Sequence, residues 1–284
     1  MAVLPVDYSG AKSDDQLVRL WLLNRPEQTQ KSYRHDAAKF LAAVGKPIHT
    51  LTVADVAAWI ERLEGSDAYK HRRLISIKSL LRFAHTTGYH VFNVGTVIRL
   101  PRLKRRLHER LMEKETALGM AAEARPGRDR TLLRLFFASG CRVSEAVGLN
   151  WADLTRISTK PGMGLVTFFG KGGKTRTVPV SLTVIDEMLA LRGPSAGPQS
   201  PVFQTQRGGK RLSVRDAQRI TAAARTDNDR ATPHFFRHSH AITALDGGSP
   251  LPELQSQLGH DKLSTTGIYI HVRLGNGSAN YIDI

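Results

Sequence analysis

Hydrophobic side chains in the first hundred residues recur with the spacing of an amphipathic helix. Val56, Trp59, Ile60 and Leu63 follow one another at three- and four-residue steps, and Thr52 ahead of them is suited to cap a helix. The same periodicity occurs at residues 14–23, 29–44 and 66–85. We therefore expect an all-helical domain of short, closely connected helices at residues 12–98.

The second half of the chain has a mixed pattern. Two β-prone runs at residues 165–169 and 175–180 are separated by the turn sequence GKGGK, which displays a lysine at its tip. Helical patterns cover residues 114–124, 129–139, 181–192, 213–225, 233–245, 251–258 and 264–271. The predicted fold is mainly α with a small β-sheet, in two domains that are joined by a linker at residues 99–110, with the second domain at 111–284.

Composition narrows the class of partner. The 284 residues contain 41 Lys and Arg against 25 Asp and Glu, a formal net charge of +16, which favours an anionic partner. A single Cys excludes an intrachain disulfide. No apolar run has the length of a signal peptide or a membrane span, so we expect a cytoplasmic protein with no membrane partner. Nucleic acid is the leading candidate, ahead of an anionic membrane surface.

The positive charge is concentrated in one window. Between residues 68 and 112 the acidic residue is Glu109 alone, and the basic residues extend from a predicted helix into the linker. A stripe of this kind suits a phosphate backbone. The predicted helix at residues 213–225 also carries arginines, and it is a candidate for insertion into the major groove of DNA. The candidate DNA-binding residues are Arg72, Arg73, Lys104, Arg105, Arg106, Arg215 and Arg219.

Two motif matches are too incomplete to support a function. Gly173-Lys174-Thr175 resembles the end of a phosphate-binding loop, but Phe168 stands where that motif needs glycine. The histidines near residue 238 lack a regular pattern of carboxylates or cysteines beside them. We therefore expect neither a metal nor a cofactor.

Five short motifs carry the candidate chemistry. They are GCRVSE, GKGGKTRTVPV, HFFRH, LGH and STTGIYIHV, in that order along the chain. Arg142 in the first falls at a predicted helix N-terminus, which favours an anion. His234 and Arg237 in the third lie three residues apart on one helix face. Each residue taken singly has an ordinary structural role, so the order and combination carry the argument.

Together these motifs resemble the tyrosine recombinase, or phage integrase, family, and are Xer-like. TQKSYRHDAAKFLAAVG and YKHRRLISIKSLLRFAHTTG are also similar to the helical core-binding domain of that family, so the resemblance covers residues 14–272. The chain departs from the family at Phe235-Phe236, at Val94 and in its short tail. The resemblance implies the catalytic residues Arg142, Lys171, His234, Arg237, His260 and Tyr269, with Glu145 in support.

The resemblance implies a metal- and ATP-independent cleavage of double-stranded DNA. Tyr269 attacks a phosphate and forms a 3′-phosphotyrosyl link. Arg142 and Arg237 bind the non-bridging oxygens with their guanidinium forks, and His260 adds a donor. The expected proton acceptor is His234. The expected general acid is Lys171, with Lys174 as its rival on the same turn.

The resemblance also implies a C-shaped clamp around DNA and a tetramer on paired sites. We expect residues 279–284, which are rich in large apolar side chains, to dock on a neighbouring protomer. Three alternatives stay open: a type IB topoisomerase-like enzyme, a non-catalytic DNA-binding relative and a basic structural nucleoid protein. The sequence gives neither the DNA target, nor the biological role, nor the need for a partner recombinase.

Overall fold

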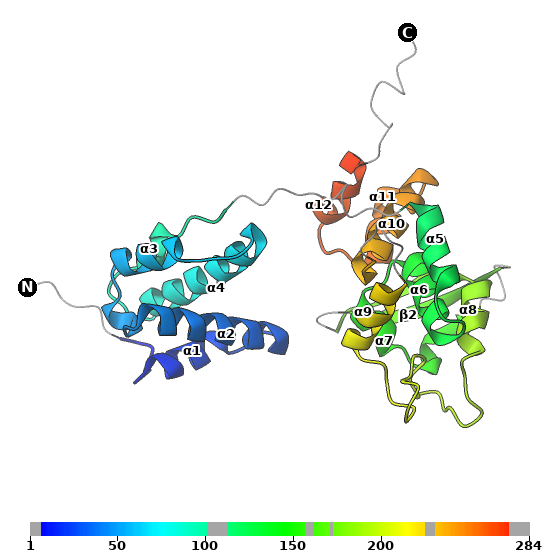
Figure 1. Ribbon diagram of the computed structural model, residues 1–284, viewed down its shortest axis with the longest axis horizontal. Helices are drawn as coiled ribbons and strands as arrows, with labels where there is room; N and C mark the ends of the chain where they lie inside the picture. Colours follow the sequence, from blue (N-terminus) through cyan, green and yellow to red (C-terminus); the bar gives the residue numbers. More distant parts are fainter. Residues whose placement is uncertain (1–6, 102–112, 157–161, 171–172, 225–230, 273–284) are drawn as a thin grey trace, which may run out of the picture. The chain divides into compact units, whose positions relative to one another are not determined.

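The computed structural model describes residues 7–101, 113–156, 162–170, 173–224 and 231–272 (Figure 1). The chain divides into two compact units, Met1–Arg105 and Arg106–Ile284. The predicted mainly helical fold with a small sheet is confirmed, and the domain limits given above stay predictions. No helix in these ranges is long and apolar enough to cross a membrane.

The first unit is built from helices with clear start and stop signals. Ser13 and Ser66 each cap a helix by accepting a hydrogen bond from a backbone N–H, and Thr52 forms a capping box with Asp55. Gly45, with φ 67°, ends the second helix in the left-handed conformation that glycine tolerates best. The helices are α1 (Asp14–Leu22), α2 (Glu27–Val44), α3 (Val53–Glu61) and α4 (Asp67–Thr86), with 3-10 turns at Ile48–Thr50 and Val94–Val97.

Aromatic and aliphatic side chains from these helices form one core. Phe40 of α2 meets Trp59 of α3 edge to face, with ring centroids 4.8 Å apart. Leu17 of α1 and Ile77 of α4 are fully buried in the same cluster. α2 and α4 lie side by side in the first unit (Figure 1). This packing explains the helical periodicity of the first hundred residues.

The second unit contains an antiparallel sheet in the order β1-β2-β3. Val166 of β2 pairs with Val178 of β3, and both side chains are buried on the face that packs against helices. The sequence did not predict the three-residue β1, because so short a strand shows no alternation. The strands are β1 (Leu154–Arg156), β2 (Met163–Phe169) and β3 (Thr175–Ser181).

The helices of the second unit pack around α6. Phe136 of α6 lies 6.4 Å from Phe236 of α10, ring centre to ring centre, in the middle of the core. The predicted single helix at 264–271 is instead a four-residue α-helix followed by a 3-10 turn, Gly267–Val272, since Thr and Gly favour α-helix poorly. The helices are α5 (Lys114–Glu123), α6 (Arg128–Ser139), α7 (Val143–Gly148), α8 (Leu182–Leu189), α9 (Val214–Ala223), α10 (Pro233–Asp246), α11 (Leu251–Leu258) and α12 (Leu263–Thr266).

Candidate active site

A glycine at the end of α6 sets the position of Arg142. Gly140 has φ 60°, and a Cβ at this position would lie 2.6 Å from His240 and 2.8 Å from Leu258. The chain therefore needs glycine both for the left-handed turn and for the close approach of α10 and α11. Two residues later Arg142 precedes α7 as its N-cap residue.

The guanidinium of Arg237 is buried and holds three segments together. Its side chain donates to the carbonyl oxygens of Gly140 at 2.5 Å and of Leu258 at 2.6 Å, and to His260 Nε2 at 2.9 Å. Only 4% of Arg237 is exposed. Burial, followed by the nearby Arg142 charge, lowers the pKa of Arg237 to about 10. The group is therefore still cationic at neutral pH, inside the protein.

Glu145 lies between two arginines. Its carboxylate accepts from Arg142 at 2.9 Å and from both terminal nitrogens of Arg176, at 2.8 and 2.7 Å. Burial would raise the pKa of this carboxyl, but the hydrogen bonds from Arg176 and from the backbone N–H of Arg142 outweigh it, and the pKa falls to about 2. Arg142 also donates to the carbonyl of Gly259 at 3.0 Å. The result is a fixed, ionised carboxylate that orients both guanidiniums.

His260 is part of the same cluster. Its Nδ1 lies 2.9 Å from Thr266 Oγ1, and its Nε2 accepts from Arg237. Burial, then the charges of Arg237 and Arg142, lower the pKa of His260 to about 4. The ring is therefore neutral at pH 7. Since Nε2 accepts, Nδ1 carries the proton in this arrangement.

Tyr269 lies in the 3-10 turn after α12, with 1% of its surface exposed. Its hydroxyl is 2.8 Å from Nδ1 of His238. Leu245, Leu254 and Leu258 belong to the same apolar cluster as the tyrosine. Burial raises the pKa of the Tyr269 phenol, while the positive charge of Arg237 acts in the opposite direction.

The predicted proton acceptor, His234, is exposed at the start of α10, and its ring lies 6.4 Å from that of His238. Sequence reasoning did not select His238, although it directly follows Arg237 and stands four residues from His234. Its position one helical turn from His234 was the available signal.

Arg176 is the other residue that sequence reasoning missed. Arg176 lies on the same face of β3 as the buried Val178 and Val180, so a charge on the inner face of a strand was the available signal. Its side chain donates to the Gln257 carbonyl at 2.7 Å and lies over the Phe168 ring at 5.2 Å. Arg176 thereby ties the sheet to α11 and to Glu145.

Part of this cluster lines a cavity of about 640 Å³. Lys174 reaches its rim and forms an exposed ion pair with Asp261. Lys171 lies outside the described residues, so its predicted role stays a prediction. Arg142, Arg176 and His260 are among the lining side chains. The concentration of cations and neutral donors around an open cavity suits an anionic group such as a phosphate.

The predicted DNA-binding residues have different surroundings. Arg72 on α4 is exposed and pairs with Asp36 at 2.8 Å, whereas Arg73 beside it is 8% exposed. Arg215 and Arg219 are exposed on α9, and Arg219 lies 3.4 Å from Asp216. Lys104, Arg105 and Arg106 lie outside the described residues. Within the described part of the chain, no group of three or more His, Cys, Asp or Glu could hold a metal.

Comparison with known proteins gives consistent matches. Residues 103–275 match the model of the Phage integrase family. The chain is 32% identical over 264 residues to tyrosine recombinase XerC of Corynebacterium efficiens, covering 88% of this chain and 83% of that protein. It is 32% identical over 270 residues to tyrosine recombinase XerC of Mycobacterium tuberculosis, covering 87% and 89%.

Solved structures share the fold. A XerH site-specific recombinase bound to a palindromic difH substrate, in a post-cleavage complex, is 21% identical, with a TM-score of 0.68 over 95% of this chain and 84% of that one. A lambda integrase tetramer bound to a Holliday junction is 18% identical, with a TM-score of 0.74 over 93% and 77%.

Proposed function

Because the chain belongs to the phage integrase family and is a site-specific tyrosine recombinase, we propose that Tyr269 is its nucleophile. The observation that carries this assignment is that Arg142 and His260 line one cavity, that the buried Arg237 donates to His260, and that the hydroxyl of Tyr269 lies 2.8 Å from His238 in the same unit. The target is a phosphodiester in double-stranded DNA.

The arginines stabilise charge on the phosphate. A phosphodiester is anionic, and its pentacovalent transition state carries more charge on the non-bridging oxygens. Arg142 and Arg237 each retain N–H donors beyond those held by Glu145 and by the carbonyls, and they are oriented before DNA arrives. The neutral His260 adds an oriented ring between Arg237 and Thr266. No metal ion is needed for this electrostatic stabilisation.

The phenol proton passes to His238 in this proposal. The oxygen of Tyr269 forms a bond to phosphorus, the bond from phosphorus to the 5′ oxygen breaks, and the proton of the phenol moves to Nδ1 of His238. The 2.8 Å contact supports His238 over the exposed His234 as the proton acceptor. The 5′ oxygen takes a proton from Lys171, or from Lys174 on the same turn.

The same chemistry run backwards rejoins DNA. A 5′-hydroxyl from a second duplex attacks the 3′-phosphotyrosyl bond and releases Tyr269, so the phosphodiester energy is conserved and ATP is not consumed. This exchange needs two duplexes and four tyrosines. We therefore propose a tetramer on paired sites, with the helical domain at 12–98 and the catalytic domain at 111–284 closing as a C-shaped clamp about the 99–110 linker, in the cytoplasm.

The decisive experiment recovers DNA that is covalently bound to the protein. Cells expressing the full chain are lysed in denaturant, the protein is purified, and attached DNA is digested and sequenced. The wild type should carry 3′-linked DNA from a restricted set of sites, while Tyr269→Phe should carry none. The control is Tyr281→Phe, which should retain the adduct. An adduct that survives Tyr269→Phe would overturn the assignment.

A second assay separates recombination from the alternative chemistry. A plasmid with two copies of the recovered site should give deletion or inversion products with the wild-type protein. Relaxation of supercoils from a plasmid with one site, without exchange between two sites, would instead support the type IB topoisomerase-like alternative. Absence of any adduct would support the non-catalytic DNA-binding relative.

A further inference from the structure

A buried histidine that takes no part in the chemistry above lies on α10. His240 is 8% exposed and follows Arg237 by three residues, so the two side chains leave neighbouring turns of one helix face. Its Nδ1 lies 2.7 Å from the carbonyl oxygen of Phe137 on α6. Its Nε2 lies 3.0 Å from the side-chain nitrogen of Gln257 on α11. The ring of His240 therefore connects α10 to the C-terminal parts of two other helices.

These contacts define which nitrogen of His240 carries the proton. A carbonyl oxygen only accepts, so Nδ1 donates to Phe137, and Nε2 is left to accept from the amide of Gln257. Burial lowers the pKa of His240 to about 4; the hydrogen bond to Phe137 opposes this shift, and the charge of Arg237 adds to it. The ring is thus neutral at pH 7, with both nitrogens bound.

Arg237 and His240 connect the same two helix ends. Arg237 donates to the carbonyl oxygen of the residue that caps α6 and to that of the last residue of α11. Phe137 lies one turn before the first of these carbonyls, and Gln257 directly precedes the second. A displacement of either partner of His240 therefore moves an acceptor of Arg237, because both belong to the same stretch of backbone.

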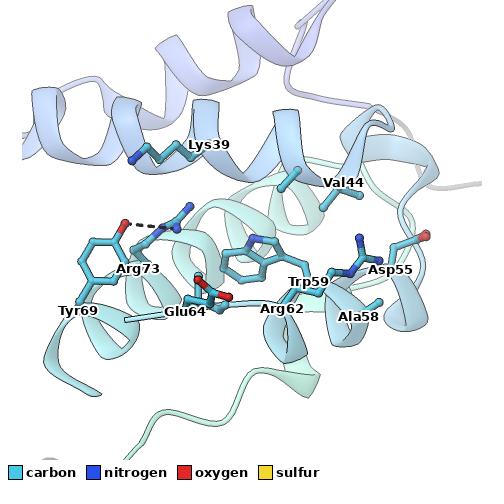
Figure 2. A pocket seen from close by; sticks show the side chains of 11 residues that line it. Lys39, Val44, Asp55, Ala58, Trp59, Arg62, Glu64, Tyr69 and Arg73 are labelled. Atoms are coloured by element: carbon cyan, nitrogen blue, oxygen red, sulfur yellow. Dashed lines mark hydrogen bonds between the residues drawn. The ribbon is translucent and has the colours of Figure 1, made fainter. Parts of the chain in front are cut away.

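The position of Arg237 depends on those acceptors more than that of another buried arginine in the chain depends on its neighbours. Arg73 on α4, 8% exposed, lies over the rings of Trp59 and Tyr69, with its guanidinium carbon 5.9 and 5.6 Å from their centroids. Its hydrogen bond to the Tyr69 hydroxyl is long, 3.4 Å (Figure 2). Contact with a ring face tolerates small rotations of a guanidinium, whereas the bonds of Arg237, at 2.5 to 2.9 Å, fix the direction of its N–H groups.

The ring of His240 also packs against the turn that leads to Arg142. A Cβ added at Gly140 would lie 2.6 Å from Cδ2 and 3.1 Å from Cγ of His240. Such close packing transmits small shifts, because the interior has little free volume to absorb them. Movement of His240 would thus reach the turn between Gly140 and Arg142 as well as Arg237.

We propose that His240 is a positioning residue for DNA cleavage. Bound to Phe137 and Gln257, its neutral ring holds the ends of α6 and α11, where their carbonyl oxygens direct the guanidinium of Arg237. It acts through Arg237 and not on the phosphate itself. This role rests on the proposed function, in which Arg237 stabilises charge on the phosphate. Such support is needed because transition-state stabilisation depends on donors that are oriented before the substrate arrives.

The test compares cleavage with binding in variants of the full chain. His240→Phe keeps an aromatic ring and removes both hydrogen bonds. Its single-turnover cleavage of the recovered site should be slower than that of the wild type by about 10- to 100-fold, because a small misplacement of Arg237 is enough to cost that much. Its dissociation constant for the same DNA should stay within about twofold, since one phosphate contact supplies a small part of the affinity.

Two further variants separate the hydrogen bonds. Gln257→Leu removes the donor to Nε2 and leaves the main-chain carbonyl that Arg176 binds, so it should slow cleavage by a smaller factor than His240→Phe. His240→Asn can still donate to Phe137 and should also be faster than His240→Phe. If His240→Phe does not fold, as judged by thermal melting, these two variants supply the answer. Cleavage at the wild-type rate by the folded variants overturns the proposal.

Val184→Ala is the matched control for stability. Val184 on α8 is 7% exposed and packs in the core of the second unit. The change should lower the melting temperature and leave the cleavage rate unchanged when cleavage is measured well below that temperature. If it slows cleavage as much as a His240 variant of equal melting temperature, the role of His240 is merely structural and the proposal is wrong.

The tautomer of His240 is measured without DNA. In protein whose imidazoles are labelled with nitrogen-15, the NMR signal that His240→Phe removes belongs to this ring. It should show a neutral imidazole with the proton on Nδ1 at pH 7, and a proton on Nε2 overturns the proposal. The outcomes are separable. A wild type that forms no adduct refutes the proposed function, whereas a wild type that cleaves no faster than the His240 and Gln257 variants refutes this inference alone.

Discussion

At the scale of single residues, the surroundings of Tyr269 shift the pKa of its phenol in opposite directions. Burial raises its pKa, the nearby charge of Arg237 lowers it, and its hydroxyl lies 2.8 Å from Nδ1 of His238. A phenol that is harder to ionise needs a base in direct contact at the moment of attack. His238 is in contact, which makes it the residue to test.

His238→Gln should slow adduct formation at pH 7 by about 10²-fold or more, the usual contribution of a general base. Replacing Tyr269 by a fluorinated tyrosine of lower phenol pKa should recover much of this loss, because the nucleophile then ionises without help. The measurement is single-turnover cleavage of the recovered site from pH 6 to 10. The cleavage rate of His238→Gln with ordinary tyrosine should keep rising to a higher pH than the rate of the wild type.

His234→Gln is the matched control for that prediction. It removes an exposed imidazole one turn away from His238 on the same helix. Its rate should fall, but fluorotyrosine should not rescue it. If fluorotyrosine rescued His234→Gln and not His238→Gln, the proton acceptor would be His234, as the sequence predicted.

The leaving group provides a second test at the residue scale. Lys171→Ala should block cleavage of an ordinary phosphodiester and spare a substrate with sulfur at the bridging 5′ position, because a thiolate leaves without a proton. Lys174→Ala is the comparison, since Lys174 is tied to Asp261 in an exposed ion pair. Sulfur rescue of Lys174→Ala alone would assign the general acid to Lys174.

Acid should weaken the cluster around Glu145. Its pKa is about 2 in the folded chain against an ordinary 4.5, so the ionised carboxylate stabilises the fold above pH 4.5 and this contribution is lost as the pH falls toward 2. The difference in free energy of unfolding between wild type and Glu145→Gln should narrow by about 2 kcal/mol from pH 6 to pH 3. Urea titrations at several pH values measure it, and a constant difference would contradict it.

At the scale of elements, the turn between α6 and α7 is the critical connection. Gly140→Ala should destabilise the second unit by about 3 kcal/mol or more, because the left-handed backbone and the contacts with His240 and Leu258 both oppose a Cβ. Gly45→Ala is the control: it has a similar φ, 67°, with nothing within 4 Å of the added Cβ, so it should cost about 1 kcal/mol. Equal losses would show that the close packing is unimportant.

Helices and the order of the motifs were predictable because they are local. Periodicity over ten residues located α3 and α4, and the motif HFFRH placed His234 and Arg237 on one helix. The partners across space were not predictable. Arg176 on the inner face of β3 meets Glu145 of α7, which lies 31 residues earlier in the chain, and a linear pattern does not specify that contact between the sheet and a helix.

The two arginines of α4 show the same limit. Arg72 and Arg73 are indistinguishable in a count of charges, yet their directions on the helix differ by about 100°. One reaches Asp36 of α2 and the other lies against Trp59 and Tyr69. Burial of an individual charge depends on the packing of three helices, which a linear pattern does not specify.

At the scale of the whole molecule, assembly is the property to test. Residues 279–284 lie outside the described residues, and their predicted role is to join protomers. Deleting them should leave binding to a single site unchanged and abolish the complex of two sites, as measured by native gel shift and by light scattering. Deletion of residues 1–6 is the control. Full recombination by the chain without 279–284 would assign assembly to other surfaces.

The burial of Tyr269 also bears on the fate of broken DNA. With 1% of the residue exposed and leucines around it, bulk water does not reach this oxygen. An ester formed at the same atom would be kept dry by the same side chains, so hydrolysis would be slow compared with attack by a DNA hydroxyl held at the site. If Tyr269 is the nucleophile that we propose, the apolar wall would protect the phosphotyrosyl ester from hydrolysis and so keep the cut DNA ends for ligation.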